Sequence, residues 1–450
     1  MLKASDLLLI FGERLCIYQS GNIFQGLVMI KGLYREYDRR VWILFSSRFV
    51  AAMGFSVAMP FLSLYLYQEL GVEMKIVGTI FMISAASRAL GTVVGGELSD
   101  IRGRRMVMVS SMSLRAVVYL GISYLVLIRA PYGILGLALV VSSFLGSVFI
   151  PASSAMVADV VSQEKRVKAY GLIRVGVNAG WALGPILGGI FATFSYSTLF
   201  LFTALCSLLT ALLIGFFVRE SLQGEERKAF SPKDLLALRR DVNFFSFCLI
   251  SLILFVATSQ MTSTLAVFSV DRVGITKIQL GYLFTTNGLI VVLLQYHLSS
   301  WLRGLRITSA MALGGILYSL GYFSVSLAGS FPLLVTSMVV ITLGEITFSP
   351  SAMTMVANLS PSAVRGRYMG AYSLFEAIGR SLGPFGGGFA LDYLKDYPIF
   401  LWGLIALLGL GGSLGFYRLG RKIPTHLNSG LGKGVVPLAK TPSPIWAGGK

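Results

Sequence analysis

Seven charged side chains lie inside long apolar stretches of the chain, where few charges are expected. They are Arg48, Arg88, Arg115, Arg174, Glu345, Glu376 and Arg380. In a membrane such a charge costs at least about 2.5 kcal/mol at the bilayer centre, so it usually faces a cavity and serves a function. A carboxylate there can bind and release protons, and a guanidinium can hold a carboxylate or phosphate in a forked geometry. The pattern therefore indicates a polar site inside a membrane protein.

Polar side chains of the same stretches are candidates for contact with a substrate. The set is Arg88, Arg115, Arg174, Asn178, Gln260 and Arg380. Four arginines near the middle of their stretches stand against two glutamates, and this surplus of cations suits an anionic or amphiphilic substrate. Mutual pairing of these charges would leave only two arginines for a substrate, so both arrangements stay open.

Composition places most of the chain in a membrane. Of its 450 residues, 55% are hydrophobic and 13% are charged, against roughly 25% charged in soluble domains. The formal net charge of +18 resides mainly in short loops between apolar stretches. This is the positive-inside pattern and not the footprint of a nucleic-acid-binding protein. It predicts a multi-pass protein of the cell membrane with both termini in the cytosol.

Nothing in the sequence points to metal, cofactor or enzyme chemistry. The three cysteines and two histidines lack the spacing of a metal site, and no nucleophile with an adjacent base is evident. We therefore expect no metal, no cofactor and no enzymatic activity. The expected partners are a small-molecule substrate, protons and the lipid bilayer, without nucleic acid, and the expected oligomeric state is a monomer.

Twelve stretches are long and apolar enough to cross a bilayer, which takes roughly 20 residues. They cover 42–68, 76–98, 106–128, 132–158, 167–192, 196–218, 243–270, 277–300, 307–328, 332–357, 366–391 and 397–418. Because backbone groups in lipid must be satisfied internally, each stretch is predicted to be a helix. The predicted fold class is an all-α integral membrane protein with twelve transmembrane helices.

An internal repeat divides the chain into two pseudo-symmetric halves. Residues 151–189 match residues 350–388 at an offset of 199, and the triplet Leu183–Pro185 recurs as Leu382–Pro384. Two six-helix halves related by an axis along the membrane normal are expected, with the substrate site near the midplane. The predicted segments are an N-terminal cytosolic extension (1–37), the first half (38–218), a cytosolic linker (219–242), the second half (243–420) and a disordered cytosolic tail (421–450). Met1 and Met29 are both possible starts.

The turn Gly96–Arg105, between the second and third stretches, is charged and contains two glycines. Its degraded copy at Leu298–Gly304 has Ser300 in place of Asp100. The motif resembles the loop 2–3 signature of the major facilitator superfamily, G-x-L-a-D-r-x-G-r-[RK], and the chain resembles that superfamily over about residues 38–420. The alternative is a topological turn whose arginines only obey the positive-inside rule.

The resemblance implies that this turn is a conformational gate. The gating set would be Gly96, Asp100, Gly103, Arg104, Arg105 and Asp159. Gly96 and Gly103 would let the backbone turn and let helices approach closely. Arg104 is expected to pair with Asp159. In the family, the aspartate that matches Asp100 faces the start of the eleventh helix, whose dipole favours negative charge. The cluster would hold the halves together in the outward-open state and release them when the site turns inward.

A second motif resembles the family's antiporter motif, G-x-x-x-G-P-x-x-G-G. Its residues are Gly180, Gly184, Pro185, Gly188 and Gly189. Glycines four residues apart give a flat face for close helix packing, and the proline weakens the helical hydrogen bonds locally. Tight packing alone is the alternative, because residues 379–388 carry the same element.

Several proton-driven drug exporters of this superfamily carry a carboxylate in the tenth helix. By that resemblance Glu345 is the first candidate for proton coupling, and Glu376 is the second. Glu376 and Arg380 are four residues apart and share one face of a helix. For each glutamate the alternative is a permanent pair with an arginine that only fixes helix packing. Ser142 and Ser143 stand where the exporters often have an arginine, which leaves a proton relay through that helix open.

The resemblance implies a secondary active transporter, of the multidrug efflux and proton antiporter kind, that exports lipophilic or amphiphilic small molecules by alternating access. One alternative is a proton-coupled symporter, or a uniporter, of an organic anion or other metabolite. The alternative of another class is a membrane-embedded enzyme or a scaffold that transports nothing. A scaffold would have no reason to keep charges near the bilayer centre.

Overall fold

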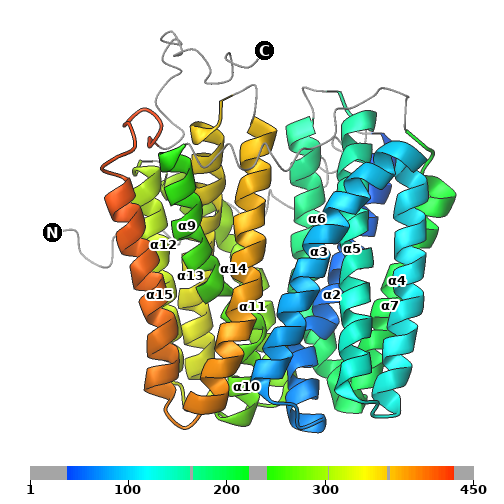
Figure 1. The fold of residues 1–450 in the computed structure, drawn as a ribbon, viewed down its shortest axis with the longest axis horizontal. Coiled ribbons are helices and arrows are strands. Elements are labelled where there is room, and N and C mark those ends of the chain that lie inside the picture. The colour runs from blue at the N-terminus through cyan, green and yellow to red at the C-terminus, as the bar shows by residue number, and fades with distance from the viewer. Residues whose placement is uncertain (1–37, 163–165, 222–240, 303, 362–364, 430–450) are drawn as a thin grey trace, which may run out of the picture. The chain divides into compact units, whose positions relative to one another are not determined.

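The computed structural model describes residues 38–162, 166–221, 241–302, 304–361 and 365–429, and these are almost entirely helical (Figure 1). By their contacts the residues form two compact units. Among the described residues, unit 1 contains those up to Tyr65 and those within 83–229, and unit 2 contains those within 66–82 and those after 229. The predicted extension 1–37, most of the linker 219–242 and residues 430–450 lie outside the described residues.

The first half of the chain forms the six helical spans expected from its apolar stretches. They are α2 (Arg39–Leu64) with a π-helical turn η1 (Tyr65–Glu69), α3 (Met74–Arg102), α4 (Arg104–Leu127), α5 (Tyr132–Val160), α6 (Arg166–Phe194) and α7 (Tyr196–Phe217). The outer part of α3, up to Met82, groups with unit 2. The helices run a few residues beyond the apolar stretches because their polar ends continue the same backbone hydrogen bonding.

The second half forms six further spans, of which the first is interrupted. They are α9 (Val242–Thr258) with a 3₁₀ turn η3 (Ser259–Thr262) and α10 (Thr264–Asp271), then α11 (Lys277–Leu302), α12 (Ile307–Val325), α13 (Phe331–Leu359), α14 (Arg365–Leu394) and α15 (Pro398–Leu419). The sequence predicts one continuous helix over 243–270. At the interruption the side chain of Gln260 donates hydrogen bonds to the carbonyls of Val256 and Gly383. A polar side chain thus connects the interruption to α14.

Eleven of the helical spans in the described residues are apolar enough to cross a membrane by length and composition. The twelfth, α14, is absent from that set. Its sequence contains Glu376, Arg380 and Asp392, which lower its mean hydropathy. Together the helices confirm the predicted all-α membrane architecture.

The same helix pairs pack together in the two units. In unit 1, α2 packs on α6, and α4 packs on both α5 and α7. In unit 2, the corresponding α9 packs on α14, and α12 packs on both α13 and α15. The repeat in the sequence is therefore a repeat in the structure.

Glycines of the second motif make the contact between α6 and α2. A Cβ atom added to Gly180 would lie 2.6 Å from the carbonyl oxygen of Phe49, and one added to Gly184 would lie 1.8 Å from Oγ of Ser56. The Ser56 hydroxyl donates a 3.0 Å hydrogen bond to the Gly180 carbonyl. Only glycine allows backbones to approach so closely. Pro185 lies inside the same helix.

Unit 2 repeats this contact between α14 and α9. A Cβ atom on Gly379 would lie 2.6 Å from Cβ of Phe255, and one on Gly383 would lie 1.7 Å from Oγ of Ser259. Both copies of the motif therefore serve tight packing within their own unit.

The chain after α15 folds back onto unit 2 and does not begin as a disordered tail at residue 421. The carbonyl of Leu427 accepts a 2.9 Å hydrogen bond from the Asn358 side chain, and Ser429 forms an isolated β-bridge with Arg306. Asn428 is 1% exposed. The predicted disorder therefore does not hold for residues 421–429, whose polar groups find partners at the ends of α12 and α13.

Candidate functional site

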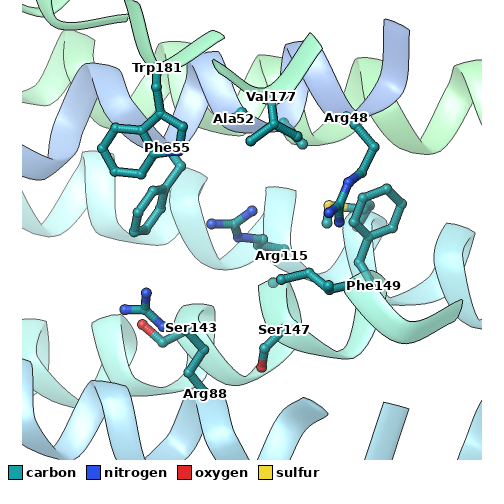
Figure 2. Close-up of a pocket in the computed structure, with 14 residues that line it drawn as sticks. Arg48, Ala52, Phe55, Arg88, Arg115, Ser143, Ser147, Phe149, Val177 and Trp181 are labelled. Carbon is teal, nitrogen blue, oxygen red and sulfur yellow. The ribbon is translucent and has the colours of Figure 1, made fainter. Parts of the chain in front are cut away.

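A cavity of about 210 Å³ opens inside unit 1, and helices α2 to α6 line it (Figure 2). Three arginines come from three helices: Arg48 from α2, Arg88 from α3 and Arg115 from α4. The other lining residues are Ala51, Ala52, Phe55, Met112, Ser143, Gly146, Ser147, Phe149, Ile150, Val177 and Trp181. No carboxylate from the described part of the chain is among them. The site therefore combines cations with apolar walls.

The Phe55 ring lies close to two of the cations. The guanidinium carbon of Arg88 is 5.5 Å from the ring centroid, and that of Arg115 is 5.7 Å from it. Both groups point toward this ring in Figure 2. On its other side Phe55 meets Trp181 in an edge-to-face contact at 5.7 Å. A cation near a ring face is stabilised by about 0.5–2 kcal/mol, so these rings help to keep the charges in place.

Arg115 is the most enclosed of the three arginines, at 6% exposure. Gly146 of α5 makes room for it, since a Cβ atom there would lie 2.7 Å from the guanidinium carbon. Arg48 lies over the Phe149 ring at 5.8 Å. The Nε atoms of Arg48 and Arg115 are buried and have no hydrogen-bond partner among the described residues. A buried donor without a partner costs about 1–3 kcal/mol.

The structure brings only some of the predicted substrate residues to this cavity. Arg88 and Arg115 line it, and Arg48, which the sequence singles out only as a charge in a span, joins them. Arg174 and Asn178 of α6 are not among the lining residues. Gln260 is 2% exposed and its amide is occupied by Val256, Gly383 and Thr264. It therefore holds the interruption of α9 and is not open to a substrate.

The two predicted coupling carboxylates lie in unit 2 and have different partners. Glu345 of α13 accepts a 2.8 Å hydrogen bond from the Asn287 amide of α11. That amide also donates to the Thr342 hydroxyl at 3.0 Å. Glu376 instead accepts a 2.9 Å hydrogen bond from Arg380 on the same face of α14. Arg380 in turn lies 5.5 Å from the Phe255 ring centroid. Glu345 thus has a neutral hydrogen-bond partner and also interacts with the charge of Arg380, whereas Glu376 is bonded to Arg380 directly.

The predicted pair between Arg104 and Asp159 is present. Nε of Arg104 lies 3.4 Å from Oδ2 of Asp159, and its Nη1 lies 2.5 Å from Oδ1 of Asp100. Arg104 is 2% exposed and also donates to the Ser99 hydroxyl at 3.4 Å. One guanidinium therefore ties the end of α3 to the end of α5.

Glu220 completes this cluster, and no sequence pattern indicates this role. Its carboxylate accepts hydrogen bonds from the backbone N–H groups of Arg104 (2.9 Å) and Arg105 (3.0 Å), at the first turn of α4. Gly103 precedes that turn with φ of 97°, and a Cβ atom there would lie 2.5 Å from a Glu220 oxygen. Gly103 is thus required for the turn and for the cap. Gly103 and Glu220 are far apart in the sequence, so no local pattern predicts their contact.

Gly96 does not serve the close helix approach that the sequence predicts for it. A Cβ atom on Gly96 would meet no atom within 4 Å, whereas one on the adjacent Gly95 would lie 2.4 Å from the Val148 carbonyl oxygen of α5. Gly91, one turn earlier, makes a similar approach to Phe144. The close contact of α3 with α5 is therefore made by the face that carries Gly91 and Gly95, and not by Gly96.

Comparison with known proteins agrees with this architecture. The family model described as Major Facilitator Superfamily matches residues 44–384. An uncharacterized MFS-type transporter, YttB of Bacillus subtilis, is 28% identical, with 82% of this chain and 93% of that protein covered. The multidrug resistance protein MdtH of Photorhabdus laumondii is 25% identical, with 87% and 97% covered.

A Na⁺, Li⁺, K⁺/H⁺ antiporter of Planococcus maritimus is 24% identical, with 82% of this chain and 96% of that protein covered. Among solved structures, a POT family transporter in complex with 5-aminolevulinic acid has a TM-score of 0.72 at 16% identity. That alignment covers 85% of this chain and 96% of the other. At this identity the structural likeness concerns the fold.

Proposed function

This chain belongs to the Major Facilitator Superfamily and is a secondary transporter, and we propose that it exports lipophilic or amphiphilic small molecules in exchange for protons. Residues 38–218 and 243–420 would alternate access by rocking against each other around the site. The similarity to a multidrug resistance protein and to a proton antiporter supports export and proton coupling.

The observation that carries proton coupling is the environment of Glu345. Its carboxylate lies within α13, partly buried, and bonds to the neutral amide of Asn287. Glu345 has no direct bond to a cation among the described residues, and the charge of Arg380 acts on it without such a bond. Glu376 is bonded to Arg380 directly. Glu345 is therefore the proton carrier, and Glu376 with Arg380 holds the face of α14.

The test uses purified protein in liposomes with an imposed pH gradient and a panel of cationic, neutral and anionic amphiphiles. Glu345→Gln should abolish gradient-driven transport while substrate binding stays measurable, because the amide keeps the size and hydrogen bonding of the carboxylic acid. Asp396→Asn, at an exposed position after α14, is the matched control and should transport as the unmodified protein does. Unchanged gradient-driven transport by the Glu345→Gln protein would refute the assignment.

The second candidate is a proton-coupled symporter of an organic anion, and the three arginines of the cavity favour it. The two functions differ in direction, because an exporter moves substrate against the proton flux and a symporter moves substrate with it. Flux of a labelled anion under inward and outward pH gradients separates them. Movement of the anion in the same direction as the protons would support the symporter and exclude anion–proton exchange.

A further inference from the structure

We propose that the cavity of unit 1 binds a compact anionic amphiphile, with a carboxylate or similar acid group at Arg48 and Arg115 and an aromatic or short aliphatic body against Phe55 and Trp181. This proposal assigns a substrate class to the site. It rests on the proposed function, because it takes the bound compound to be the transported one. It also separates this chain from exporters whose ligands are cations.

Charge gives the first argument. Arg48 and Arg115 reach one cavity from two helices, and no carboxylate in the described residues lines it. Arg115 is 6% exposed, and both side chains have a buried Nε without a hydrogen-bond partner in the described part of the chain. Buried cations need a compensating anion or hydrogen bonds. A carboxylate in the cavity would compensate the charge of the two guanidinium groups and relieve the repulsion between them.

Shape and polarity give the second argument. Beside the cations, Phe55 and Trp181 form an edge-to-face pair, and Met112, Phe149 and Val177 continue the apolar wall. An ammonium ligand would find the Phe55 ring already in contact with the cations Arg88 and Arg115. The apolar part of a ligand would instead lie against ring edges and aliphatic groups.

Size limits the ligand further. The cavity measures about 210 Å³, above the roughly 150 Å³ of a cavity that binds benzene and below the roughly 300–1,000 Å³ of pockets for drug-sized ligands. It therefore fits a one- or two-ring acid, or the acid end of a longer molecule. A phospholipid headgroup carries similar acid chemistry, and the measurements below separate that source from a soluble ligand.

The test compares three probes with the same apolar body and different charge: 1-naphthoate, 1-naphthamide and 1-naphthylmethylammonium. Binding is measured by calorimetry on the purified full-length protein in phosphatidylcholine nanodiscs. We expect naphthoate to bind, and the amide and the ammonium to bind at least roughly tenfold more weakly, because each loses a charge-assisted hydrogen bond. Equal or stronger binding of the ammonium probe would overturn the proposal.

Variants locate the anion. Arg115→Gln should weaken naphthoate binding by roughly 10- to 100-fold and leave naphthamide binding nearly unchanged. Arg115→Lys keeps the positive charge but loses the paired N–H groups of the guanidinium. Its naphthoate affinity should lie between those of the unmodified protein and of Arg115→Gln. Arg421→Gln, at an exposed position of unit 2, controls for the loss of one positive charge. If Arg115→Gln does not fold, Arg48→Gln gives the same comparison. Naphthoate affinity that is insensitive to both substitutions would overturn the site.

Two further measurements separate the possible failures. Nanodiscs of phosphatidylglycerol test a lipid source, and loss of naphthoate binding there would assign the cavity to a lipid headgroup and overturn a soluble ligand. Transport by the same protein tests the premise. Arginine-dependent binding without gradient-driven transport would refute the proposed function and keep the site. Glu345-dependent transport of cations without naphthoate binding would refute the site and keep the function.

Discussion

Glu220 and Asn428 perform the same task in the two units. Each follows the last span of its unit and accepts a hydrogen bond from a backbone N–H group at the start of that unit's third span. Glu220 binds the N–H groups of Arg104 and Arg105 in α4, and Asn428 binds the N–H of Thr308 in α12 at 3.0 Å. The first cap is charged and joins an ion cluster, whereas the second is neutral and buried.

Glu220→Ala should therefore destabilise unit 1 by about 1 kcal/mol, as expected for loss of a helix cap. The effect should shrink at high salt, because the interaction of an exposed carboxylate with the end of a helix is screened. Hydrogen exchange of the first turn of α4, measured at low and high ionic strength, tests this.

Asn428→Ala provides the comparison. It removes bonds to the Thr308 N–H and hydroxyl, both in a buried setting, so faster exchange at the start of α12 should not depend on salt. Equal salt dependence of the two variants would contradict the distinction between a charged and a neutral cap.

Arg104→Lys should slow transport while substrate affinity stays the same. The guanidinium bonds at once to Asp100, Asp159 and Ser99, and a single ammonium cannot reproduce three directed contacts. If the cluster is the gate, its loss changes the rate of the conformational step and not the cavity. Initial transport rates and calorimetric affinity, measured on one preparation, separate these effects. A weakened affinity with an unchanged rate would argue against the gate.

Gly184→Ala should destabilise the contact between α6 and α2 by about 1–3 kcal/mol, the usual cost of overpacking. The new methyl group would overlap Oγ of Ser56, so the double variant with Ser56→Ala should recover part of the loss. Gly96→Ala is the matched control, since its methyl group meets open space and alanine favours the helix. Thermal unfolding midpoints in detergent measure all three. A control that loses as much as Gly184→Ala would contradict the packing account.

Sequence patterns predicted those features that depend on spacing along the chain. The repeat located both glycine contacts, and the charged turn led to the Arg104–Asp159 pair. The sequence patterns did not distinguish Arg115 from Arg174, because both arginines interrupt apolar stretches. Rotation of each helix about its axis decides which one reaches the cavity, and packing sets that rotation.

The interruption at η3 has a signal in the sequence, because it lies in the polar run Thr258–Thr264 inside an apolar stretch. The bond from Gln260 to Gly383, on another helix, accompanies this interruption and has no such signal. The Glu220 cap connects positions far apart in sequence, and many exposed glutamates would look alike. Hydrogen bonds from a side chain to a distant backbone group therefore cannot be predicted from a local sequence pattern.

Helix α2 has two different roles on two of its faces. Ser56 and the backbone at Phe49 face the glycines of α6, while Arg48, Ala51 and Phe55 face the cavity. Ligand preference can thus drift by mutation at positions 51 and 55 without loosening the backbone contact beside them. A library randomised at those two positions should yield folded proteins with new ligand ranges, and the same diversity at position 56 should mostly yield unfolded ones.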